Sequence, residues 1–180
     1  IISQLDTTGK CPEVNEDGTV KVSSAESENG YLCSAPDDYG TSYYYRGNVE
    51  NNWVKFAGYY WRILRINGDG SIRMIYAGDA SVIDALDNKE EVLKNGYNDS
   101  STDYTQIGVS TFNVSKGDNA YVGYMYGTPG SSTYEETHAN MNNSKIKTTV
   151  DDWYEKHIKG TEYEGYISDT LFCNDRSFAS

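Results

Sequence analysis

The chain has 180 residues, which suits one domain with a core of its own, and its 17 Tyr and three Trp argue against a disordered chain. Its formal net charge of −12 disfavours nucleic acid and anionic membranes as partners. No apolar run approaches the ~20 residues of a membrane helix, so no membrane insertion is expected.

Residues 1–40 are predicted to form an irregular N-terminal arm closed by a disulfide between Cys11 and Cys33. The stretch between these cysteines is acidic and rich in Gly, Asn and Ser, so a disulfide there would contribute roughly 3 kcal/mol to a segment with little core. The composition is typical of secreted proteins, and the alternative is three free cysteines in a reducing cytosol. Cys173 is then left over, either free or paired with a residue of a longer parent chain.

Residues 42–77 predict an antiparallel sheet, because aromatic and β-branched runs alternate with turns. Asn67-Gly68-Asp69-Gly70 predicts a hairpin turn, since glycine supplies the positive φ that such turns need. The run before it has apolar side chains on both faces, which predicts a central strand with Trp61 in the core. Alternation places Trp61, Ile63 and Arg65 on one face and Tyr60, Arg62, Leu64 and Ile66 on the other. The expected strands are 42–46, 53–57, 59–66 and 71–77.

The second half of the chain predicts one main helix over residues 144–159. Ser144 provides a cap, apolar residues including Trp153 recur at helical spacing, and Gly160 ends the helix. We expect Trp153 to be a core residue where this helix packs on the sheet. The other expected elements are a short amphipathic helix within 80–97, polar loops over 98–119 and 131–140, a strand over 121–126 and a short helix or turn over 163–171.

These elements predict an α+β fold: a central antiparallel sheet with one main helix, about 144–159, packed on it, and long loops. We expect two regions, the disulfide-closed arm 1–40 and an α+β domain 41–180 that is truncated at its C-terminus.

Five runs of the sequence carry a resemblance to a known domain: 43–49, 56–63, 67–76, 120–126 and 146–154. They resemble an uncharacterised domain of secreted and surface proteins of gut Gram-positive bacteria. That domain is distantly similar to the C-type-lectin-like and formylglycine-generating-enzyme-like folds. The resemblance covers roughly residues 11–178 and implies a partial lectin-like fold and an extracellular location on a bacterial cell surface. It implies no particular activity.

No catalytic residues, metal site or cofactor are predicted. The only histidines, His138 and His157, are expected at the surface, and the chain lacks a Gly-x-Ser-x-Gly elbow, a Cys-x-x-Cys pair and the spacing of a calcium loop. Adjacent carboxylates such as Asp151-Asp152 are expected to be solvated. The alternatives that stay open are a glycan hydrolase that uses carboxylates and a structural subunit of a surface fibre.

Three tyrosines, Tyr124, Tyr126 and Tyr134, are the candidate ligand-binding residues, together with the intervening Gly127-Thr128-Pro129-Gly130 loop. Tyrosine among Ser, Gly and Thr is typical of adaptable binding surfaces. The alternative is that these rings pack on the sheet. The sequence therefore favours a non-catalytic extracellular domain for binding or adhesion, with a host protein such as immunoglobulin, or a glycan, as its partner.

Overall fold

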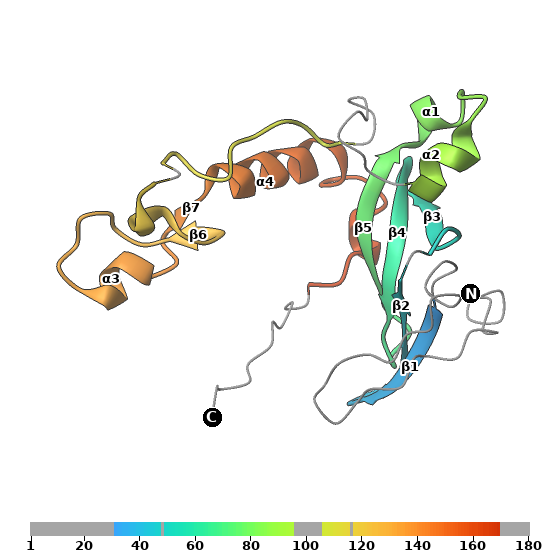
Figure 1. Ribbon diagram of the computed structural model, residues 1–180, viewed down its shortest axis with the longest axis horizontal. Coiled ribbons are helices and arrows are strands. Elements are labelled where there is room, and N and C mark those ends of the chain that lie inside the picture. Colours follow the sequence, from blue (N-terminus) through green and yellow to red (C-terminus); the bar gives the residue numbers. More distant parts are fainter. Residues whose placement is uncertain (1–30, 48, 96–105, 116, 170–180) are drawn as a thin grey trace. The chain divides into compact units, whose positions relative to one another are not determined.

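A computed structural model of the protein describes residues 31–47, 49–95, 106–115 and 117–169 (Figure 1). The chain divides into two compact units, residues 1–109 and 110–180. The first contains a five-stranded antiparallel sheet, and the second contains a two-stranded sheet and the longest helix, so the fold is α+β. The predicted packing of that helix on the larger sheet concerns both units and stays a prediction. Cys11 and Cys173 lie outside the described residues, so the disulfide also stays a prediction.

The sheet of the N-terminal unit is organised around β4, the predicted central strand. β5 pairs with one edge of β4. β3 pairs with the start of the other edge, the middle of β2 pairs with its end, and β1 extends the sheet beyond β2. The arm 1–40 was expected to be largely irregular, but residues 31–37 form β1, because β2 offers its backbone groups along its full length. The strands are β1 (Tyr31–Asp37), β2 (Gly40–Arg46), β3 (Trp53–Phe56), β4 (Tyr59–Ile66) and β5 (Ile72–Asp79).

The predicted hairpin turn between β4 and β5 is confirmed, and it lies against the turn between β1 and β2. The Asp37 carboxylate accepts hydrogen bonds from the backbone N–H groups of Gly68 (2.8 Å) and Tyr39 (2.9 Å), and the Gly68 bond is the main cause of its lowered pKa. A Cβ on Gly68 would lie 2.3 Å from Asp37 Oδ1 and 2.6 Å from the Gly40 nitrogen. Glycine at position 68 is therefore required by this close approach of two turns.

The pairing of β4 with β5 is interrupted at two places. The register shifts between Tyr60 and Trp61 and again after Ile63. The second shift leaves Leu64 of β4 without a partner on β5, which accounts for the spacing of three residues between the buried Ile63 and Ile66. The prediction of Trp61 as a core residue is wrong, because this side chain is half-buried. Its indole nitrogen donates to the Phe56 carbonyl (2.9 Å).

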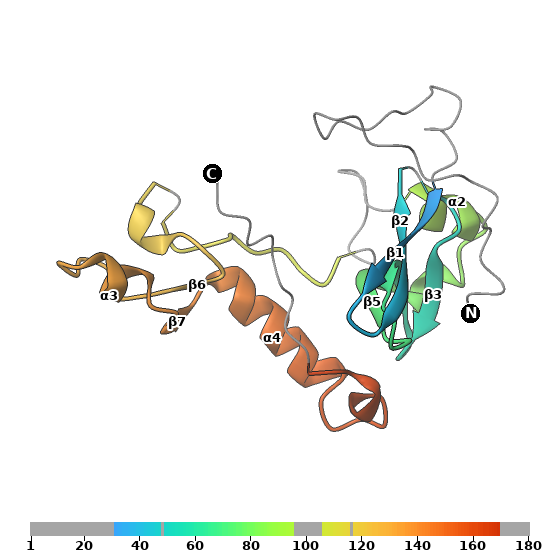
Figure 2. The same ribbon diagram turned by 90° about the horizontal axis from the view of Figure 1, so that it is seen from below.

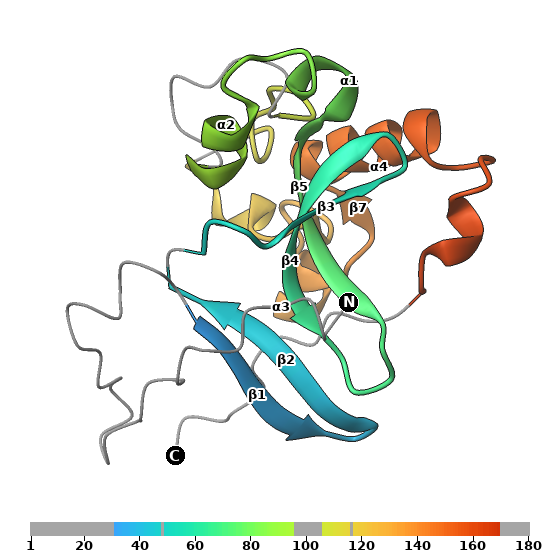
Figure 3. The same ribbon diagram turned by 90° about the vertical axis from the view of Figure 1, so that its right-hand side faces the viewer.

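A small core forms at the end of the sheet where β4 begins and β5 ends (Figure 3). It contains Tyr60, Ala80, Ile83 and Leu93, and the ring of Trp53 meets that of Tyr60 edge to face with centroids 5.7 Å apart. Two short helices, α1 (Ala80–Ile83) and α2 (Lys89–Asn95), contribute to it. They replace the single helix expected within residues 80–97, because the chain turns between Ile83 and Leu93 so that both side chains reach Tyr60.

Arg62 of β4 connects this helical region to the sheet. Its half-buried guanidinium donates to the carbonyls of Val49 (2.9 Å), Leu93 and Lys94 (2.7 Å) and to Asn52 Oδ1 (2.6 Å). Two of these carbonyls lie in the last turn of α2, where helical carbonyls lack partners of their own. Burial lowers the pKa of the guanidinium. Arg62 therefore holds α2 and the loop before β3 on the central strand.

Asp84, which follows α1, forms a second connection. Its carboxylate accepts hydrogen bonds from Lys55 of β3 and from the Tyr60 hydroxyl (2.6 Å), and Lys89 lies 3.4 Å away. The bonds from Lys55 and then Tyr60 lower the pKa of Asp84 to about 2. Burial, together with Asp84, raises the pKa of Tyr60 to about 12. This arrangement ties α1 to two strands of the sheet.

The C-terminal unit is built on α4 (Lys145–His157), which confirms the predicted helix, its cap at Ser144 and the turn at Gly160 (Figure 2). No residue of α4 itself is fully buried: Trp153 is half-buried, and Ile158 just after the helix is buried. The core position of Trp153 was predicted where the helix meets the larger sheet, so it stays a prediction together with that packing. The remaining elements are the 3-10 turn η3 (Asn119–Tyr121), β6 (Met125–Tyr126), α3 (Tyr134–His138), β7 (Asn142–Asn143) and the 3-10 turn η4 (Glu164–Tyr166).

Two local predictions for this unit are wrong. The expected strand over 121–126 is divided into η3 and β6, because Asp118 caps η3 by accepting from the Ala120 N–H (2.9 Å) and Gly123 turns the chain with φ of +101°. The expected polar loop over 131–140 contains α3, capped by Thr133.

Within the described ranges, no helix is long and apolar enough to cross a bilayer.

Candidate functional site

The C-terminal unit holds its loops on a short backbone scaffold. β6 pairs with β7, and the ladder continues where Ser144 N–H donates to Tyr124 O (3.1 Å) and Met141 N–H donates to Tyr126 O (3.1 Å). The N–H of Ile146 donates to Phe112 O (3.2 Å), which ties the segment before η3 to the first turn of α4. These bonds join three stretches that are distant in sequence, so they give the surface between them a defined shape.

The predicted Gly127–Gly130 loop is fixed at its start. The N–H groups of Gly127 and Thr128 donate to the carbonyls of Thr137 and Glu136, each at 2.9 Å, and Asn142 donates to Gly127 O (2.7 Å). A Cβ on Gly127 would lie 1.9 Å from Glu136 O. Only glycine lets the loop lie this close to α3.

The three predicted ligand-binding tyrosines do not converge on one site. Tyr134 is 72% exposed on α3, and its ring stacks on His138 with centroids 4.0 Å apart. Tyr124 is 46% exposed, with the Lys147 ammonium 5.9 Å from its ring centre, and burial is the main cause of its raised pKa. Tyr126 is half-buried and meets Tyr121 edge to face, with centroids 5.0 Å apart. Each tyrosine therefore has a different environment.

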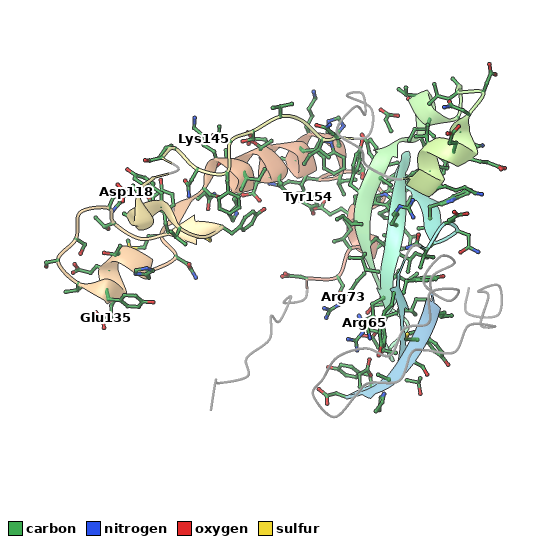
Figure 4. The ribbon with its side chains drawn as sticks, in the orientation of Figure 1. Arg65, Arg73, Asp118, Glu135, Lys145 and Tyr154 are labelled. Carbon is green, nitrogen blue, oxygen red and sulfur yellow. The ribbon has the colours of Figure 1, made fainter. Side chains whose placement is uncertain are left out.

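A cavity of about 520 Å³ lies between the segment 111–123 and the start of α4. This volume is within the range of small-molecule sites. Phe112, Val114, Tyr121 and Val122 line it with apolar surface. Asp118 and Lys145, which Figure 4 labels, are the charged residues among the described part of its lining, and Thr111, Asn113 and Ser115 add polar groups.

Hydrogen bonds fix the walls of this cavity. The side-chain amide of Asn113 donates to Tyr121 O (2.6 Å), and its Oδ1 accepts from the Val114 N–H (3.2 Å). Asp118 Oδ1 is held by the Ala120 N–H, which leaves Oδ2 with no hydrogen-bond partner among the described residues. Lys145 is the first residue of α4, directly after the Ser144 cap, and its ammonium likewise makes no ion pair with a described residue. The cavity thus has a fixed apolar wall and two charged groups that are open to a ligand.

Sequence reasoning missed the residues that line the cavity. Phe112 and Asp118 lay in a stretch interpreted as an exposed loop, and Tyr121 in a stretch interpreted as a strand. The sequence did contain a signal for a turn at this place. Asp118 can cap a turn by accepting a hydrogen bond from the N–H of Ala120, and Gly123 then allows the chain to change direction.

In the portion of the chain that the structure describes, no group of three His, Cys, Asp or Glu side chains is arranged to hold a metal ion.

Comparison of the chain with models of protein families, with curated proteins and with solved structures finds no match, so the resemblance to a bacterial surface domain stays a prediction.

Proposed function

We propose that this protein is a non-catalytic extracellular domain of a bacterial cell surface and that its C-terminal unit binds a glycan. The observation that supports the proposal is the cavity beside α4, which combines an aromatic wall with hydrogen-bonding groups at its edge. A sugar ring has the complementary chemistry, since its C–H face packs on an aromatic ring while its hydroxyls need donors and acceptors. Few and well-placed polar groups in an apolar site are typical of specific small-ligand recognition.

Exposure of the apolar lining also favours a ligand. Phe112 is 56% exposed and Val122 is 63% exposed, although both lie on a segment held by backbone and side-chain hydrogen bonds. Covering apolar surface contributes about 25 cal/mol for each Å² removed from water. Because the wall is already ordered, a ligand that covers it loses little of this free energy to ordering the protein.

A glycan hydrolase is the less favoured alternative. Hydrolysis of a glycosidic bond by the usual mechanism requires two carboxyl groups on opposite sides of the bond. Asp118 is the one carboxylate among the described residues that line the cavity. The lining therefore supports recognition of a sugar better than cleavage of one.

A host-protein partner is the second candidate, and a different surface favours it. Tyr134 and Met141 are each 72% exposed and lie outside the cavity lining. Rigid tyrosines of this kind are common in protein-binding surfaces. The two candidates therefore depend on different residues, which allows one experiment to separate them.

The test is binding of the purified protein to an array of immobilised neutral and acidic glycans. We expect Phe112→Ala to lower glycan binding at least tenfold, while Tyr134→Ala, the matched aromatic control outside the cavity, leaves it unchanged. Circular dichroism checks that both variants are folded. Absence of glycan binding by the wild-type protein would overturn the proposal, and release of sugar from the array would favour the hydrolase.

A further inference from the structure

We infer that the cavity of the C-terminal unit accepts one uncharged pyranose residue, with its C–H face on Phe112 and Tyr121 and its hydroxyls between Asp118 and Lys145. This inference rests on the proposed function and specifies the class of sugar. Its basis is the pairing of an ordered apolar wall with one open acceptor and one open donor of opposite charge.

The aromatic part of the site is preorganised. The Tyr121 ring is held edge-on by the ring of Tyr126 at 5.0 Å, and the Tyr121 backbone is held by Asn113. The backbone of Phe112 is fixed through its carbonyl, which accepts from the Ile146 N–H of α4. The backbone that carries both rings is therefore ordered before a ligand binds, which lowers the entropy that binding costs.

The acceptor is Asp118 Oδ2. Because Oδ1 is occupied by the Ala120 N–H at 2.9 Å, the carboxylate has a defined orientation, and its second oxygen is available to a ligand hydroxyl. Hydrogen bonds from a hydroxyl to an ionised carboxylate are among the stronger kinds. One sugar hydroxyl bound here is expected to fix the orientation of the sugar ring in the cavity.

The donor is Lys145. Five of the seven described lysines form ion pairs with carboxylates, and Lys145 and Lys156 are the two that form none with a described residue. Only Lys145 of these two lines the cavity. Its ammonium can donate to the ring oxygen or hydroxyls of a sugar without breaking an existing ion pair.

The charges favour an uncharged sugar. An acidic sugar would gain an ion pair with Lys145 but meet the like charge of Asp118, and an amino sugar with a free ammonium group would gain one with Asp118 but meet Lys145, so each combines an attraction with a repulsion. Residues 110–180 contain six Lys and Arg against ten Asp and Glu, so the unit also repels an acidic ligand at longer range. A neutral pyranose can use both charged groups and is repelled by neither.

The experiment titrates the whole protein, followed by NMR, with methyl glycosides of neutral hexoses and, separately, with glucuronic acid and glucosamine. We expect the neutral glycosides to bind more tightly than their charged counterparts. Lys145→Met and Asp118→Asn should each weaken neutral-sugar binding at least fivefold. Asp118→Asn keeps the side-chain oxygen that caps η3, and Lys156→Met serves as the matched control with unchanged affinity.

The outcomes separate the inference from the proposed function. The inference is overturned, while glycan binding stands, if glucuronic acid binds more tightly than the neutral glycosides. The same conclusion follows if Lys145→Met and Asp118→Asn leave the affinity unchanged but Phe112→Ala abolishes binding. If no sugar binds the wild-type protein, in this titration or on the array, both fail.

Discussion

Replacement of Arg62 tests whether one guanidinium holds the helical region on the sheet. Arg62→Ala removes four hydrogen bonds, three of them to backbone carbonyls of Val49, Leu93 and Lys94. A buried hydrogen-bond acceptor that loses its partner typically costs about 1 to 3 kcal/mol. Because Arg62 is half-buried, water can replace part of what its four acceptors lose, so we expect about 3 kcal/mol of unfolding free energy in all.

Two further variants make this measurement specific. Arg62→Lys keeps the charge but cannot reach the same set of acceptors, so we expect it to lose roughly half as much. Arg46→Ala is the control, since the exposed side chain of Arg46 at the end of β2 makes no hydrogen bond with a described residue, and its effect should stay within about 0.5 kcal/mol.

The assay combines urea unfolding, followed by near-ultraviolet circular dichroism, with hydrogen exchange of peptides that cover α2. We expect Arg62→Ala to lower the urea midpoint and to speed exchange in α2 (Lys89–Asn95) more than in β1 and β2. A loss below about 1 kcal/mol, or unchanged protection of α2, would refute the proposed role of Arg62.

Three other predictions follow from single contacts. Asp84 has a folded-state pKa of about 2, below its unfolded value, so its contribution to stability is complete above the unfolded pKa and disappears as the pH falls toward 2. NMR titration of the carboxyl group should give that low midpoint. Asp84→Asn should make the free energy of unfolding depend less on pH in the acid range. Gly127→Ala places a Cβ 1.9 Å from Glu136 O and should lower the free energy of unfolding by about 1 to 3 kcal/mol in thermal unfolding. Gly165→Ala is the control, because a Cβ at position 165 meets no atom within 4 Å, and it should change stability little. Non-reducing mass spectrometry should find the peptides of Cys11 and Cys33 linked and lighter by two hydrogens, and alkylation of Cys11 in the native protein would contradict the disulfide.

Local sequence determined the elements whose ends depend on a few neighbouring residues. Ser144 and Gly160 marked α4, and Asn67-Gly68-Asp69-Gly70 marked the hairpin between β4 and β5. The strands β2 to β5 followed in the same way from aromatic and β-branched runs, whereas β1 did not. Caps and turns act within four or five residues, so their effect is readable without knowledge of the rest of the chain.

Tertiary structure decided the features that depend on pairing between distant segments. The shift in the β4–β5 register after Ile63 lets Ile63 and Ile66 both be buried at a spacing of three residues, which strict alternation along one strand cannot show. The cavity depends still more on tertiary structure, because it forms where the backbone of Phe112 meets α4 at Ile146. Such contacts join residues more than thirty positions apart, and their free energy comes from packing and hydrogen bonding across that distance, so no local pattern in the sequence records them.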